Sequence, residues 1–265
     1  MASTTDDWST NIAEVRDDDV LIRGRLLTSM IGKCSFGELA YLLISGRWPT
    51  KGQAHVLEAI MVSVMEHGIS PTTTVTRMMA SYGNPIQVGI AAGMLTIGDH
   101  HGGAGEQIAG WLREAIASVQ STGVDRRDEI RTKARSIVTE RRAAREPIEG
   151  FGHPHHDVDP RAPLLIRIAN EYGVYGDYCL LLESIEAELE AAVGRRIATN
   201  IDGVSAALLL DLGLDPRLAR PILMAPRTLS LAAHFIEEQD QGQKWRHVPG
   251  SQVTYTGPQH LRTIE

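Results

Sequence analysis

The chain has 265 residues, of which 43% are hydrophobic and 22% charged, as is typical of a soluble globular protein with a large core. Its formal net charge of −7 argues against a nucleic-acid-binding surface, which needs a dominant basic face. The first residues lack the pattern of a signal peptide, and no run of about 18 apolar residues predicts a membrane span. Cys34 and Cys179 are expected to be reduced thiols, although a disulfide is an alternative, and together these features predict a cytoplasmic protein.

Helical patterns separated by Gly and Pro fill most of the chain, and only residues 13–24 have the short alternating runs of a β-hairpin. Ser35 and Glu38 form a capping-box pattern, and that helix is expected to end at Gly46. Pro71 and Pro85 suit the first turns of two later helices. Helical segments are expected at residues 35–46, 51–67, 71–83, 86–98, 101–120, 125–145, 162–173, 177–194, 200–213 and 216–239.

Three of these segments have distinctive compositions. Residues 86–98 are almost all apolar or small, which predicts a helix buried on all sides. Residues 125–145 are highly charged and predict a solvated amphipathic helix, whose apolar stripe consists of Ile130, Ala134, Ile137 and Val138. Residues 241–265 are polar and irregular. The chain is therefore predicted to be all-α, with at most a short N-terminal β-hairpin.

Histidines gather in two glycine-containing segments. The segment GFGHPHHDVDPRA, residues 150–162, holds His153, His155 and His156. The segment GDHHGGAGE, residues 98–106, places His100 and His101 at a helix entrance, where free amides favour a negatively charged ligand. A metal site is the alternative for the first segment, although the chain lacks the HxxxH and paired CxxC spacings of zinc sites.

Asp202 lies between Asn200 and Gly203 at the start of a very apolar helix. Partial burial there would raise the pKa of its carboxyl group and make it a stronger base. The alternative is that Asp202 serves as the N-cap of the helix, a role for which aspartate is well suited. On the residues alone, the N-cap is the preferred interpretation.

Several motifs in the same order resemble the citrate synthase superfamily, and in particular its short citryl-CoA lyase branch. They are the RG turn of residues 23–24, EHGISPTTTVTR, GDHHGGAGE, GFGHPHHDVDPRA, NIDG, APRTLSLAAHFIEE and VTYTGP. The resemblance covers nearly the whole chain. The short segment between Thr50 and Glu66 is similar to free-standing citryl-CoA lyases and to the corresponding module of ATP citrate lyase.

The resemblance implies that His101, His153 and Asp202 are the catalytic residues in a retro-aldol cleavage of citryl-CoA to acetyl-CoA and oxaloacetate. His153 would accept the hydroxyl proton, and His101 would hydrogen-bond the thioester oxygen. Asp202 would deliver a proton to the methyl carbon, or remove one in the condensation direction.

The resemblance also implies binding residues and an assembly. Substrate carboxylates would be bound by His67, Arg161, Arg227 and Arg246, the last across a homodimer interface. Coenzyme A would lie against Gly150, Phe151, Gly152, Pro154 and His155. A coenzyme A thioester is the substrate, and no cofactor or metal is implied. A large dimerisation domain, residues 1–105 and 200–265, and a small domain on the coenzyme A side, residues 106–199, are expected.

The sequence departs from citrate synthases at Gly105, where the family has asparagine, and at Pro154, where it usually has arginine. These departures leave the identity of the acyl group and the oxo acid open. A synthase-type condensation followed by thioester hydrolysis is the first alternative to the lyase. A metal-dependent hydrolase and a non-catalytic module that binds coenzyme A thioesters are the other two.

Overall fold

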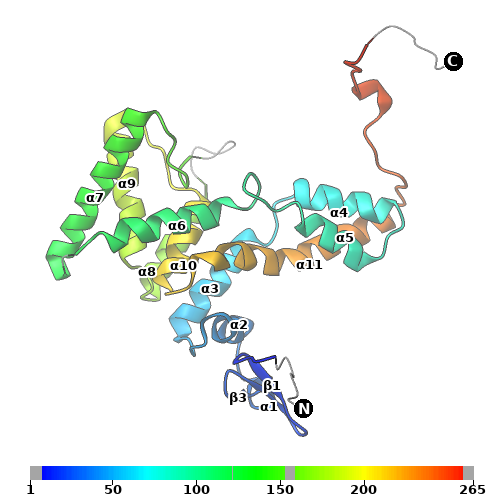
Figure 1. Cartoon of the computed structure of the whole chain (residues 1–265), viewed down its shortest axis with the longest axis horizontal. Coiled ribbons are helices and arrows are strands. Elements are labelled where there is room, and N and C mark those ends of the chain that lie inside the picture. Colours follow the sequence, from blue (N-terminus) through cyan, green and yellow to red (C-terminus); the bar gives the residue numbers. More distant parts are fainter. Residues whose placement is uncertain (1–7, 121, 153–158, 259–265) are drawn as a thin grey trace, which may run out of the picture. The chain divides into compact units, whose positions relative to one another are not determined.

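The computed structural model describes residues 8–120, 122–152 and 159–258 and is predominantly helical (Figure 1). Its contacts divide the chain into two compact units. The first comprises the residues up to Glu66 together with Ile97–Arg227, and the second comprises His67–Thr96 and the residues from Thr228 onward. The predicted division of residues 1–105 and 200–265 from residues 106–199 stays a prediction.

The first unit begins with a three-stranded antiparallel sheet, in which strand order follows the chain and Ala13 pairs with Ile22. The hairpin prediction is thus confirmed, with one additional short strand. The elements of this unit are β1 (Ala13–Val15), β2 (Val20–Ile22), β3 (Arg25–Leu26), α1 (Leu27–Met30), α2 (Phe36–Ser45), α3 (Lys51–Val64), α6 (Ala104–Ala117), α7 (Gly123–Ala144), α8 (Arg161–Glu171), α9 (Asp177–Val193), α10 (Ile201–Asp211), η1 (Pro216–Leu218) and the start of α11 (Ala219–Asp240).

Helix ends follow the local signals in the sequence. Ser35 accepts a hydrogen bond from the amide of Glu38, whose side chain in turn accepts one from the Ser35 amide. This reciprocal pair satisfies two amides that the first turn of α2 would otherwise leave unpaired. Gly46 ends α2 in the left-handed conformation, which glycine adopts without a Cβ penalty.

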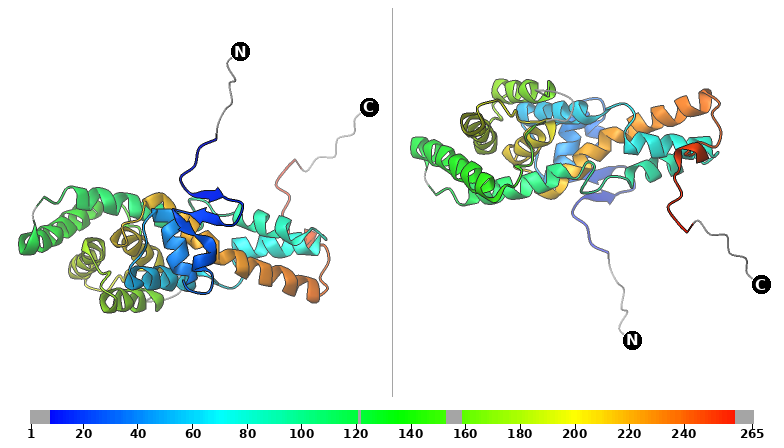
Figure 2. Two further views of the ribbon diagram at one scale, coloured as in Figure 1. Left: turned by 90° about the horizontal axis from the view of Figure 1, so that it is seen from below. Right: turned by 90° about the horizontal axis from the view of Figure 1, so that it is seen from above.

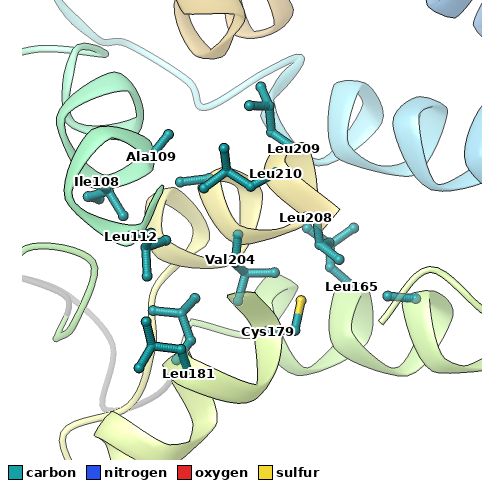
Figure 3. Packing of buried hydrophobic residues seen from close by; sticks show 14 of the residues in the cluster. Ile108, Ala109, Leu112, Leu165, Cys179, Leu181, Val204, Leu208, Leu209 and Leu210 are labelled. Atoms are coloured by element: carbon teal, nitrogen blue, oxygen red, sulfur yellow. The ribbon is translucent and has the colours of Figure 1, made fainter. Parts of the chain in front are cut away.

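Helix α10 forms the centre of the hydrophobic core. Figure 3 shows Val204 and Leu208 of α10 beside Leu112 of α6 and Leu181 of α9. All four side chains are almost completely shielded from solvent, and burying each large aliphatic side chain contributes about 1.5–3 kcal/mol. The core therefore fixes the position of α10, whose N-terminal turn carries Asp202.

Helix α7 packs against α9 (Figure 1), as the predicted apolar stripe requires. Ile130, Ala134 and Val138 are buried. The polar face carries exposed ion pairs such as the one between Arg131 and Asp128 at 2.8 Å. The expectation of a solvated amphipathic helix is confirmed. Both cysteines are free thiols, and no helix in the described part of the chain is long and apolar enough to cross a membrane.

The second unit contains α4 (Pro71–Ser81), α5 (Ile86–Met94), the later part of α11 and η2 (Gly250–Gln252). Helices α4 and α5 lie side by side in all views (Figures 1 and 2). A Cβ on Gly93 would come within 2.1 Å of Oγ1 of Thr76, so only glycine permits this close approach.

The prediction that residues 86–98 are buried on all sides is wrong for the single chain. Gly89 and Gly93 are the only buried residues of α5, whereas Val88 is 41% and Leu95 just after the helix 85% exposed. The small residues pack on one face, and no other element among the described residues of the second unit covers the opposite apolar face.

Candidate active site

The N-terminus of α10 is capped by Asn200. Its side-chain oxygen accepts a hydrogen bond from the Gly203 amide at 3.0 Å. The preferred sequence interpretation, that Asp202 is the N-cap, is therefore wrong. Asp202 lies in the first turn of α10 and is partly buried, where its carboxylate interacts electrostatically with His101 and Arg227. The structure thus leaves the alternative role of Asp202, as an acid or base, available.

Asp159 holds the same helix end and was not among the predicted site residues. It is 1% exposed, and its carboxylate accepts a hydrogen bond from the Ile201 amide at 3.2 Å. Nε and Nη2 of Arg161 donate to its two oxygens at 2.9 and 2.8 Å. Burial alone would raise the pKa of Asp159, but the hydrogen bonds from Arg161 and Ile201 keep it below the usual aspartate value. Its position beside Arg161 in the sequence was the available signal.

Residues Gly150–Gly152 form a glycine-rich segment that is hydrogen-bonded to Ala198 and Asn200, just before α10. The Gly152 amide donates to the Ala198 carbonyl at 2.8 Å, and the Asn200 amide donates to the Gly150 carbonyl at 2.9 Å. Asn200 Nδ2 also donates to the Gly152 carbonyl at 2.9 Å. A Cβ on Gly203 would lie 2.6 Å from the Gly150 carbonyl oxygen, so this close approach requires glycine. Residues Gly150–Gly152 are therefore held beside the first turn of α10, which carries Asp202.

Three predicted site residues, His153, Pro154 and His155, lie outside the described residues, as do the neighbouring His156 and Asp157. Within residues 8–120, 122–152 and 159–258, no three His, Cys, Asp or Glu side chains gather as metal ligands would. The metal-site alternative for the histidine segment consequently stays untested.

His101 ends a tight turn in which its amide and carbonyl are both hydrogen-bonded to Gly98, at 3.0 and 2.9 Å. The adjacent Gly102 has a φ of 76°, a left-handed conformation that favours glycine. Burial lowers the pKa of His101, the positive charge of Arg227 lowers it further, and Asp202 opposes both. A neutral imidazole at neutral pH can donate a hydrogen bond without carrying charge. His100, by contrast, is exposed.

Arg220 fixes the ends of this turn and was missed by the sequence interpretation. Its guanidinium forms ion pairs with Asp99 at 2.5 Å and with Glu106 at 2.7 Å. One arginine at the start of α11 thus contacts both the residue before the histidine pair and the first turn of α6. No sequence motif marked it, because its two partners are more than 110 residues away.

Two predicted arginines lie near the catalytic candidates. Arg227 is 8% exposed and its Nε donates to the Val64 carbonyl at 3.0 Å. Burial lowers the pKa of Arg227, and the positive charge of Arg161 lowers it further. The negative charges of Glu66 and Asp202 act in the opposite direction. Arg161 donates one further hydrogen bond to the Ser63 carbonyl at 3.3 Å. Since a guanidinium has five N–H groups, Arg161 retains donors for a substrate carboxylate.

The first unit therefore brings together His101, Asp202, Arg161 and Arg227. This group combines a neutral imidazole and a carboxylate with two guanidinium groups. Such a group can bind an anionic substrate and move a proton at carbon or oxygen. The other predicted substrate residues, His67 and Arg246, belong to the second unit. His67 is exposed, and Arg246 is paired with the fully buried carboxylate of Glu238.

The sequence profile of the citrate synthase C-terminal domain matches residues 51–247. The chain belongs to the citrate synthase family. Citrate synthase from Acidithiobacillus ferridurans is 30% identical over 84% of this chain, and citrate synthase from Heyndrickxia coagulans is 26% identical over 83%. The chain spans only 55% and 56% of the length of these two citrate synthases.

Solved structures extend the family comparison. The structure of citryl-CoA lyase from Hydrogenobacter thermophilus matches with a TM-score of 0.87 and 32% identity, and the match covers 97% of both chains. ATP citrate lyase from Methanothrix soehngenii, in complex with citrate and coenzyme A, matches with a TM-score of 0.80 and 22% identity over 97% of this chain and 43% of that chain. The second likeness shows the fold alone. The expected citrate-synthase-like helical fold is confirmed.

Proposed function

We propose that this protein is a citryl-CoA lyase that cleaves citryl-CoA, or a close analogue, to acetyl-CoA and oxaloacetate. One observation carries the choice of lyase: the structure of citryl-CoA lyase from Hydrogenobacter thermophilus matches 97% of this chain with a TM-score of 0.87 and 32% identity. The arrangement of His101, Asp202 and the two arginines supports the same chemistry.

In the proposed reaction, the bond between the carbinol carbon and the methylene carbon of citryl-CoA breaks. The hydroxyl proton passes to His153, the carbinol carbon becomes the keto carbon of oxaloacetate, and the bonding electrons move toward the thioester oxygen. Neutral His101 donates a hydrogen bond to that oxygen as charge develops. Protonated Asp202 then delivers its proton to the carbon, which gives the methyl group of acetyl-CoA.

Product analysis tests this function. We expect purified protein incubated with citryl-CoA to yield acetyl-CoA and oxaloacetate in equal amounts, measured by liquid chromatography and mass spectrometry against an enzyme-free control. Citrate and free coenzyme A would instead identify thioester hydrolysis, as in a citrate synthase. Hydrolysis that is lost with a chelator and restored by a metal ion would favour the metal-dependent hydrolase. Binding of citryl-CoA without conversion would favour the non-catalytic module.

We also propose a homodimer, with Arg246 of each chain contributing to the site of the other. The exposed apolar face of α5 supports it, because exposed Ile86, Val88 and Leu95 are unusual on a helix so rich in apolar residues unless a partner covers them. A second copy of this chain carries the same face and can cover it in a two-fold arrangement. The free thiols of Cys34 and Cys179 support a cytoplasmic location.

Replacing Val88 by glutamate is expected to dissociate the dimer, because it introduces a charge into the buried apolar interface. In sedimentation experiments, the wild-type mass should be twice the 29.0 kDa of one chain, and the variant should sediment as a monomer. Val62→Glu is the matched control, since Val62 is 68% exposed on α3 and belongs to the first unit. Equal masses for the wild type and Val88→Glu would refute the role of α5.

A further inference from the structure

Ser205 lies three residues after Asp202 on α10, so the two side chains emerge from the same face of the helix. Its hydroxyl oxygen is buried and has no hydrogen-bond partner. A buried hydroxyl without a partner loses its hydrogen bonds to water without compensation, which makes such groups rare. The unpaired hydroxyl of Ser205 therefore requires an explanation.

Several other serines within helices or at helix ends donate to a carbonyl of the preceding turn. Ser63 donates to Ile60, Ser81 to Met78, Ser118 to Ala115 and Ser184 to Leu180, all at 2.7 Å. This back-bonding is the usual arrangement for serine within a helix. Ser205 does not adopt it. Its hydroxyl is oriented elsewhere.

Ser205 and Asp202 line one cavity of about 30 Å³ inside the first unit. One water molecule needs roughly 10–15 Å³ of such space, so the cavity has room for one. The other lining residues provide no polar side chain: they are Ile60, Val64, Gly102, Gly105, Ala206, Leu209, Ala219, Ile222 and Leu223. The carboxylate of Asp202 is consequently the only side-chain acceptor that the described lining offers to the Ser205 hydroxyl.

We propose that Ser205 is a positioning residue, whose hydroxyl donates to the Asp202 carboxylate across this cavity, directly or through one water molecule. This inference rests on the proposed function for the role of Asp202 in proton transfer. A hydrogen bond to the charged form of a carboxyl group stabilises that form. The serine would thereby orient the carboxylate and set how readily it takes up a proton. His101 and Arg227 interact electrostatically with the same carboxylate. The walls contributed by α3, α6 and α11 are apolar.

The test is a titration of the free protein, which does not require turnover. Aspartate carboxyl groups are labelled with carbon-13, and the Asp202 resonance is identified by its loss in Asp202→Asn. Ser205→Ala should raise the pKa of Asp202 by roughly 0.4–1 unit, the amount expected for one lost hydrogen bond. Ser205→Thr, which retains a hydroxyl, and Ser184→Ala, which removes a back-bonded one, should both leave it unchanged.

The pH profile of citryl-CoA cleavage gives the second measurement. The part of the activity–pH profile that depends on the ionisation of Asp202 should move to higher pH in Ser205→Ala. The size of this move should equal the pKa shift of Asp202 in the titration. An identical Asp202 titration in Ser205→Ala and wild type would overturn the proposal, whatever the activity. A shifted titration in a protein that does not act on citryl-CoA would support the Ser205–Asp202 pair and refute the proposed function instead.

Discussion

Replacing Asp202 by asparagine is expected to lower kcat for citryl-CoA cleavage by about 10³-fold, because proton transfer by one positioned side chain contributes roughly 10²–10⁴-fold. The amide has nearly the shape of the carboxyl group but cannot deliver a proton to carbon. Since Asn200 rather than Asp202 caps α10, the variant should retain the cap and fold normally. Steady-state kinetics with citryl-CoA, combined with thermal unfolding, measures both effects.

Asp128→Asn is the control for this substitution. Asp128 lies on α7, is 68% exposed and pairs only weakly with Arg131 in the same helix, so its replacement should leave kcat unchanged. Wild-type turnover by a folded Asp202→Asn variant would remove Asp202 from the mechanism. A loss of activity accompanied by unfolding would mean instead that the first turn of α10 depends on the charge.

Replacing Asp159 by asparagine is expected to lower the free energy of unfolding by about 3 kcal/mol, because breaking a buried ion pair leaves the other charge unpaired. The carboxylate has two oxygens that accept from Arg161 and Ile201. An amide replaces one of these oxygens with a donor, which then faces another donor. Activity should fall as well, since both Arg161 and the start of α10 lose their common support. Urea unfolding and citryl-CoA kinetics measure these effects.

The chain contains a matched control for this prediction. The sequence Asp-Pro-Arg occurs again at residues 215–217, where Nε and Nη2 of Arg217 donate to Asp215 at 2.9 and 2.8 Å, as in the buried pair. The Asp215 side chain is 38% exposed, so water can replace the lost hydrogen bonds and Asp215→Asn should change stability little. Equal effects of the two substitutions would contradict the importance of burial.

The pH dependence of the Asp159 contribution follows from the direction of its pKa shift. The folded-state pKa lies below the unfolded aspartate value of about 3.9. The contribution to stability is therefore fully present above that value and is lost as the pH falls through the folded-state pKa. The difference in unfolding free energy between wild type and Asp159→Asn should be constant from about pH 5 to 8 and shrink below about pH 4.

The sequence by itself determined the helices and most of their ends. Ser35 and Glu38, and likewise Pro71, act on amides within three residues, so local patterns were sufficient to predict α2 and α4. Motif order was also sufficient to predict the family. It placed His101, Asp202, Arg161 and Arg227 in one site, and their roles in catalysis stay predictions.

The tertiary structure alone decided how these residues are supported. Asp159 and Ile201 are 42 residues apart, and no local pattern predicts that one carboxylate binds both Arg161 and the start of α10. The sequence alone favoured Asp202 as the N-cap of α10, and only the structure showed that Asn200 occupies that position. The exposure of the apolar face of α5 likewise depended on which other helices pack against it in the folded chain. Local hydrogen bonds depend on near neighbours in the chain, whereas burial and electrostatic environment depend on residues that only folding brings together.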